Sequence, residues 1–112
     1  DITFVGRDEA ERIWGTVTPA EIRAFLPHCA LLVVKDGDVG ATAFDGDAEP
    51  VFVPAPVVEV VEPVGAGDAF ASGFLAATLD GADLAARLSA GHAAAERVLK
   101  IAADLPPLVP LA

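Results

Sequence analysis

Residues 60–74 read VVEPVGAGDAFASGF, and this stretch decides the fold. A branched apolar run over 57–61 predicts a strand, whereas from Asp68 onward the apolar residues recur at helical spacing. The stretch is therefore expected to run from a strand through a loop into a helix. Such a junction gathers free backbone N–H groups at the positive end of the helix dipole. Gly65 and Gly67 permit a tight turn and the close approach of an anion, so the sequence predicts an anion-binding turn here.

Asp68 opens the expected helix, where its carboxylate can point toward the same anion. A phosphate site beside a carboxylate suits phosphoryl transfer, which needs positioning, charge stabilisation and a group that accepts the proton of the attacking hydroxyl. A second interpretation fits Gly65, Ala66, Gly67 and Asp68 equally well. In that interpretation the glycines form an ordinary turn and the aspartate is only a helix N-cap.

Helices and strands alternate ahead of this junction, which predicts an α/β unit with a β-meander. The run 31–35 is apolar throughout, as is typical of a strand covered on both faces. Thr18 and Glu21 are spaced as a capping box. The expected elements are a strand at 2–5, helices at 8–14 (closed by Gly15) and from Thr18 to near Pro27, strands at 31–35, 39–44, 50–54 and 57–61, and two helices after Asp68 that are separated at Asp80 and Gly81.

The charge balance excludes two classes of partner. Seven basic residues against 17 acidic ones give a formal charge of -10, which repels nucleic-acid phosphates and anionic membrane surfaces. A phosphate site in this chain would therefore depend on backbone amides, a few placed cations and Mg²⁺. Cys29 is the only cysteine, so no intrachain disulfide forms and a reducing cytoplasm is the simplest setting. A small buried residue is the favoured interpretation of Cys29.

The length suits one compact unit, and 54% hydrophobic residues supply its core. Because the chain starts at Asp1 directly before the strand-like run 2–5, with no signal peptide, we treat residues 1–112 as a fragment of a longer protein. Loss of upstream strands would expose sheet edge and core. That exposure favours self-association, so a homo-oligomer is an open alternative.

The stretch 60–74 resembles the C-terminal signature of the ribokinase-like (PfkB-type) carbohydrate kinases, D-T-x-G-A-G-D-x-F-x-x-G. The matching residues are Gly65, Ala66, Gly67, Asp68, Phe70 and Gly73. The resemblance implies that the glycine turn is the anion hole for the transferred phosphate of ATP and that Asp68 is the general base. It also implies a ribokinase-like sheet flanked by helices. The chain would be the C-terminal nucleotide-binding part of that domain, lacking most of the acceptor site and inactive by itself.

Lys35, Gly37 and Gly40 resemble the K-x-G-x-x-G turn that lies beside the nucleotide phosphates in this family. The resemblance implies that Lys35 contacts a phosphate and that Gly37 lets the nucleotide approach closely. Taken alone, the same residues favour an ordinary hairpin with a solvated lysine.

Glu9 matches the glutamate of the family's N-x-x-E motif, which helps to organise Mg²⁺ and its waters, although Gly6 stands where asparagine is usual. Otherwise Glu9 is a solvated charge on a helix. His92 falls where relatives have an Asn-Ala-rich helix against the adenine. It is expected either to contact the purine edge or to cap an exposed helix face.

Glu62 and Pro63 replace the Asp-Thr pair that helps many relatives to bind a monovalent cation, so no such cation is carried over to this chain. Gly6 and the run 57–61 fit the subgroup of 2-keto-3-deoxygluconate kinases. The resemblance therefore implies ATP-dependent phosphorylation of a hydroxyl on a sugar or sugar acid. The alternatives are a nucleoside or other alcohol kinase of the same family, a catalytically silent nucleotide-binding protein, and a pure interaction module.

Overall fold

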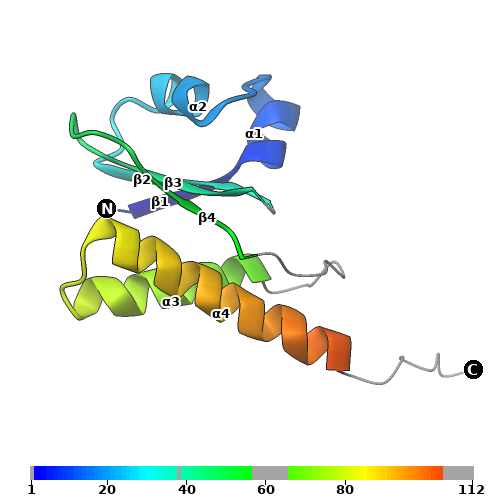
Figure 1. The fold of residues 1–112 in the computed structure, drawn as a ribbon. Helices are drawn as coiled ribbons and strands as arrows, with labels where there is room; N and C mark the ends of the chain where they lie inside the picture. The colour runs from blue at the N-terminus through cyan, green and yellow to red at the C-terminus, as the bar shows by residue number, and fades with distance from the viewer. Residues whose placement is uncertain (1, 38, 57–65, 105–112) are drawn as a thin grey trace, which may run out of the picture.

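The sheet has four strands and lies between two pairs of helices (Figure 1). α1 and α2 cover one face, and α3 and α4 cover the other. The computed structural model describes residues 2–37, 39–56 and 66–104, the last of these ranges by its backbone alone at 66 and 99–104. The elements in chain order are β1 (Ile2–Gly6), α1 (Arg7–Trp14), α2 (Pro19–Phe25), β2 (Leu31–Asp36), β3 (Gly40–Asp45), β4 (Val51–Pro54), α3 (Ala66–Leu79) and α4 (Leu84–Asp104).

The strand order is β1-β2-β3-β4. β1 runs parallel to β2, and α1 and α2 form the crossover between them. β2, β3 and β4 are antiparallel neighbours, so the predicted α/β unit and its β-meander are confirmed. The predicted strand at 57–61 lies outside the described residues.

Local sequence signals set the ends of the first two helices. α1 stops at Gly15, whose φ of 71° is a left-handed conformation that glycine adopts without a steric penalty. α2 begins with the predicted capping box. The backbone N–H of Glu21 donates to the Thr18 hydroxyl at 3.1 Å, and the Glu21 carboxylate accepts from the Thr18 backbone N–H at 3.3 Å.

β2 separates two apolar cores, because its alternate side chains point to opposite faces of the sheet. Leu31 and Val33 pack with the aromatic side chains of α3. Leu32 and Val34 pack with Ile22 and the rest of the α1/α2 side. The strand covered on both faces is therefore confirmed. Cys29, expected to be buried, is only half-buried at the edge of the second cluster.

Small residues bring α3 and α4 into close contact, as their composition predicts. A Cβ on Gly73 would lie 2.5 Å from the carbonyl oxygen of Ala90. A Cβ on Gly91 would lie 2.7 Å from the ring of Phe70. Both distances are shorter than atoms can approach without displacement, so packing alone requires glycine at these two positions.

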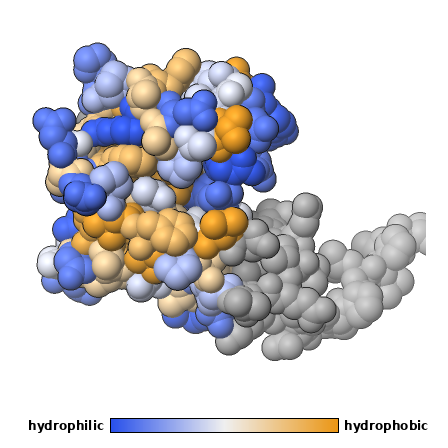
Figure 2. Space-filling view, turned by 45° about the horizontal axis from the view of Figure 1, so that its top comes forward, coloured by the Kyte–Doolittle hydropathy of each residue, from blue (hydrophilic) through white to orange (hydrophobic). Residues whose placement is uncertain are grey.

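Hydrophobic side chains also reach the surface. Figure 2 shows hydrophobic residues over the lower part of the view, where α3 and α4 lie, and a mixture of hydrophilic and hydrophobic residues over the upper part. Leu79 of α3 is 90% exposed. Trp14 of α1 and Phe25 of α2 are also exposed, and their rings stack with their centres 4.8 Å apart. No helix in the described part of the chain combines the length and hydropathy needed to span a bilayer.

Candidate active site

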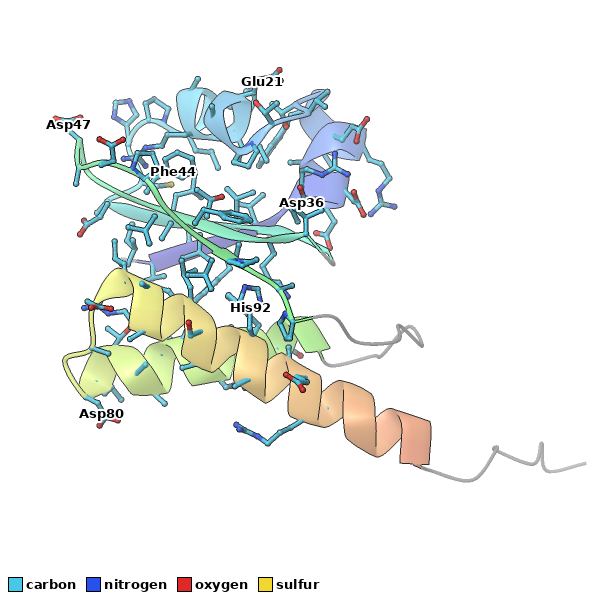
Figure 3. All side chains as sticks on the ribbon, in the orientation of Figure 1. Glu21, Asp36, Phe44, Asp47, Asp80 and His92 are labelled. Carbon is cyan, nitrogen blue, oxygen red and sulfur yellow. The ribbon has the colours of Figure 1, made fainter. Side chains whose placement is uncertain are left out.

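The candidate site lies where the two parallel strands end. Gly6 at the end of β1 is opposite Lys35 near the end of β2. α1 starts directly after β1, and Asp36 and His92 lie toward the same end of the sheet as the start of α3 (Figure 3). In open α/β sheets, ligands bind beyond the carboxyl ends of parallel strands. The fold thus collects residues that are widely separated in sequence at one edge.

The first turn of α3 contains three of the four residues of the predicted anion turn, namely Ala66, Gly67 and Asp68. Gly65 lies outside the described residues. The backbone N–H groups of a first turn have no acceptor within their own helix. Gly67 and Asp68 are exposed, and a Cβ on Gly67 would meet no atom within 4 Å. Packing within the described residues therefore does not require glycine at position 67, whereas close approach of a ligand would.

Lys35 does not behave as a solvated lysine. Its Nζ lies 4.4 Å from the centre of the Phe70 ring, a cation–π contact one helical turn from the start of α3. The side chain is partly buried, and this burial lowers the pKa of the ammonium. No carboxylate of the described residues forms an ion pair with Lys35. An ammonium that has lost water and gained no counter-ion is a favourable partner for an incoming anion.

His92 is buried rather than capping an exposed helix face, so that alternative is wrong. The residue is 6% exposed, and its Nε2 lies 3.0 Å from the carbonyl oxygen of Val53. Its ring also meets Phe70 edge-on at 5.2 Å. Burial lowers the pKa of His92, the hydrogen bond to Val53 opposes that shift, and the charge of Lys35 adds to it.

Phe70 is thus the common neighbour of the lysine and the histidine. The sequence singles out Phe70 only as a match to the signature, because a contact between distant elements leaves no trace in local spacing. Its ring is fully buried. This ring holds Lys35, from β2, and His92, from α4, beside the start of α3.

The glycines of the hairpin have different surroundings. Gly37 adopts φ 45° in the turn, and nothing lies within 4 Å of where its Cβ would be. A Cβ on Gly40 would lie 2.6 Å from both the Phe52 ring and the carbonyl oxygen of Val53 on the neighbouring strand. Pairing with β4 therefore accounts for glycine at position 40, while Gly37 is open to a ligand.

Glu9 is exposed in the first turn of α1. Gly6 is the N-cap of that helix and supplies no side-chain hydrogen bond. Arg7, which motif spacing does not single out, pairs with Asp8, Glu11 and Asp36. The sequence signal that could have found it is the acidic pattern around one arginine at a helix start.

Glu9 is the only carboxylate assigned to Mg²⁺ in this site, and a single carboxylate limits how the ion could bind. The described residues contain no group of three or more His, Cys, Asp or Glu side chains placed to hold a metal ion. Mg²⁺ commonly keeps several waters and is held by one or two carboxylates together with substrate phosphates. Glu9 therefore fits a metal ion that arrives with a nucleotide, rather than one held by protein ligands alone.

The pfkB family carbohydrate kinase pattern matches residues 1–103. ATP-dependent 6-phosphofructokinase from Thermoanaerobacterium thermosaccharolyticum is 39% identical over 83% of this chain and 29% of its own length. Cytidine kinase from Thermococcus kodakarensis is 39% identical over 89% of this chain and 37% of its own length. 2-Dehydro-3-deoxygluconokinase from Dickeya dadantii is 28% identical over 96% of this chain and 36% of its own length. The chain spans about a third of the length of these relatives.

Solved structures agree with the fold. Adenosine kinase from Sinorhizobium meliloti superposes with a TM-score of 0.78 at 34% identity, over 89% of this chain and 31% of that one. Arabidopsis thaliana ribokinase, solved with ribose and ATP, superposes with a TM-score of 0.76 at 28% identity, over 89% of this chain and 35% of that one. The predicted ribokinase-like arrangement of sheet and helices is confirmed.

Proposed function

The chain belongs to the pfkB family of carbohydrate kinases, and on that premise we propose that the protein carrying it transfers the γ-phosphate of ATP to a hydroxyl of a sugar or sugar acid. Residues 1–112 would form its nucleotide-binding part. The observation that carries the proposal is the first turn of α3, which is exposed and leaves open space at Gly67. Beside it lies Lys35, an ammonium without a counter-ion among the described residues.

Asp68 acts as the general base in this proposal. The acceptor hydroxyl oxygen forms a bond to the γ-phosphorus, the bond between that phosphorus and the bridging oxygen breaks, and ADP leaves with the electron pair. The Asp68 carboxylate takes the hydroxyl proton. The backbone N–H groups of Ala66, Gly67 and Asp68 donate to the phosphoryl oxygens as negative charge develops there.

Lys35 and Gly37 serve the nucleotide phosphates in the same scheme. The Phe70 ring already contacts the Lys35 ammonium at 4.4 Å, so the side chain loses little conformational entropy when it pairs with a phosphate. Mg²⁺ bound with ATP would neutralise phosphate charge, with Glu9 holding one of its waters. No monovalent cation enters this scheme.

His92 offers a hydrogen-bond acceptor to a purine edge. The Val53 carbonyl can only accept, so in the neutral imidazole Nε2 carries the proton and donates, and Nδ1 keeps its lone pair. The lowered pKa favours this neutral form. An exocyclic amine of adenine is a suitable donor to Nδ1.

The acceptor is the open part of the proposal, because the relatives named above include a phosphofructokinase, a sugar-acid kinase and nucleoside kinases. A nucleoside or other alcohol acceptor is therefore the second candidate. We would assay the full-length protein with a panel containing 2-keto-3-deoxygluconate, fructose 6-phosphate, ribose, adenosine and cytidine. The acceptor with the highest kcat/KM decides between the two classes.

Asp68→Asn in the full-length protein tests the chemistry. Loss of a general base costs about 10²- to 10⁴-fold in rate, so kcat should fall by that factor while the Kd for ATP stays within about twofold. Asp83→Asn, at an exposed carboxylate before α4, is the matched control and should keep full activity. An Asp68→Asn protein that binds ATP normally and keeps its rate would exclude Asp68 as base. A wild-type protein that binds ATP but phosphorylates nothing in the panel would favour the catalytically silent alternative.

A further inference from the structure

Arg7 links three segments of the chain at the edge where the parallel strands end. Its Nε donates to Asp36 Oδ1 at 2.7 Å, and its two terminal nitrogens pair with Asp8 at 2.6 Å and Glu11 at 3.1 Å. A longer contact of 3.4 Å reaches the carbonyl oxygen of Val17. These contacts raise the pKa of the guanidinium, chiefly through Asp36, so the charge is permanent.

The hydrogen bond from Arg7 to Asp36 lies directly beyond the last paired residues of β1 and β2, and it joins the ends of the two strands through side chains. Gly6, the last residue of β1, is paired with Lys35, and the residues that follow them in the chain are Arg7, which begins α1, and Asp36, which ends β2. Asp36 also begins the hairpin, where its carbonyl oxygen accepts from the Val39 N–H at 2.8 Å. One side-chain bond therefore connects the first turn of α1 to the turn between β2 and β3. Both partners are about three-quarters buried, with 25% and 27% of their side chains exposed, so water screens this pair less than a surface pair.

Apart from the contacts of Arg7, no described residue gives the first turn of α1 a side-chain cap at its start. Its N-cap is Gly6, which makes no side-chain hydrogen bond, although φ -81° and ψ 131° are the extended values that an asparagine N-cap would adopt. A Cβ placed on Gly6 would lie 3.7 Å from the nearest Glu9 atom, an ordinary contact. The position therefore has room for a β-carbon, and the chain has glycine there.

We propose that the Arg7–Asp36 pair takes over the anchoring that an N-cap side chain would give, and makes the first turn of α1 and the Gly37 hairpin one positioned unit. Arg7 and Asp36 are positioning residues in this account. They act through Glu9 on one side and through Lys35 and Gly37 on the other. The inference rests on the proposed function for its effect on nucleotide binding, but the link between the two segments does not.

The test uses the full-length protein and four variants: Arg7→Gln, Asp36→Asn, the double variant Gly6→Asn with Arg7→Gln, and Arg12→Gln as control. Arg12 is an exposed arginine on the same helix. Removing a residue that orients a metal ligand typically costs about 10- to 100-fold in metal affinity. The Mg²⁺ concentration for half-maximal ATP binding should therefore rise about tenfold in Arg7→Gln and Asp36→Asn. Acceptor KM and the value for Arg12→Gln should stay within about twofold.

Hydrogen exchange without ligands separates the link from the activity. Arg7→Gln should lose amide protection in peptides 7–15 and 36–41 together. Adding Gly6→Asn should restore protection of 7–15 only, because the new cap anchors α1 but not the hairpin, and should return the Mg²⁺ midpoint to within about threefold of wild type.

Exchange in Arg7→Gln identical to wild type, or equal losses in Arg12→Gln, would overturn the inference. So would an unchanged Mg²⁺ midpoint. If the wild-type protein shows no Mg²⁺-dependent ATP binding, the proposed function fails, and the exchange experiment alone then decides whether Arg7 links the two segments.

Discussion

The first turn of α3 and the two turns that follow it differ in what requires their glycines. A Cβ on Gly67 would meet nothing, whereas a Cβ on Gly73 would lie 2.5 Å from the Ala90 carbonyl oxygen and 2.9 Å from the Ala94 Cβ. Asp68 is exposed, while Phe70 and Phe74 are fully buried. One signature thus combines an exposed turn with a packing surface for α4, and its two glycines have different surroundings.

The largest effect we expect comes from making the same change in both regions. Gly73→Ala should destabilise the full-length protein by about 1–3 kcal/mol, because the new methyl overlaps backbone atoms that cannot move independently. Gly67→Ala should leave stability unchanged or raise it by up to about 1 kcal/mol through helix propensity. Urea unfolding followed by circular dichroism measures both.

Activity should separate the same two variants in the opposite sense. Per folded molecule, Gly73→Ala should keep its kcat/KM for ATP, and Gly67→Ala should lose about tenfold, the effect of a small misplacement at a phosphate contact. Equal loss of stability in both variants would remove the distinction between an open turn and a packed one.

A smaller effect is expected from the lysine that connects the two regions. Lys35→Met keeps the apolar stem on Phe70 and removes the charge, so the KM for ATP should rise about tenfold, the value of one charge-assisted hydrogen bond of roughly 1.5 kcal/mol. Arg97→Met removes the same charge from an exposed position on α4 and should change KM less than twofold. A KM unchanged in Lys35→Met would return Lys35 to a purely structural role.

The smallest effect concerns His92, which packs against the buried ring of Phe70. Its pKa in the folded protein is lowered from the ordinary 6.5, mainly by burial, so the unfolded chain binds the proton more tightly. This contribution to stability is complete above about pH 6.5 and is lost as the pH falls through the folded pKa. His92→Gln should flatten the dependence of Tm on pH below about pH 6.5, which thermal unfolding of both proteins over a pH series measures.

Much of the fold follows from the sequence because its signals are local. Gly15, the Thr18 capping box and the apolar run of β2 each specify a helix end or a strand from a few neighbouring residues. Boundaries moved by one or two residues. β3 runs Gly40–Asp45 against the expected 39–44, and α3 begins at Ala66, two residues before the expected start at Asp68. The strand order could be established only from the structure, although the turns in the sequence predicted the β-meander.

The candidate site was predictable only in part. Asp68, Gly67 and Lys35 carry recognisable spacing, whereas the partners of His92 depend on how β4 and α4 meet. The alternative in which His92 caps an exposed helix face is wrong, since burial by distant elements cannot be inferred from neighbours in sequence. The partial burial of Lys35 against Phe70 escaped the sequence for the same reason. The roles of all the candidate site residues stay predictions, as does a homo-oligomer; these residues are Glu9, Lys35, Gly37, Gly40, Gly65, Ala66, Gly67, Asp68 and His92.

The close contact of α3 with α4 also constrains movement. With Gly73 against the Ala90 carbonyl oxygen and Gly91 against the Phe70 ring, neither helix can slide or rotate along the other without steric overlap. Any displacement during turnover must therefore carry α3 and α4 together, as a rigid body. Asp68 of α3 would then stay fixed relative to His92 of α4.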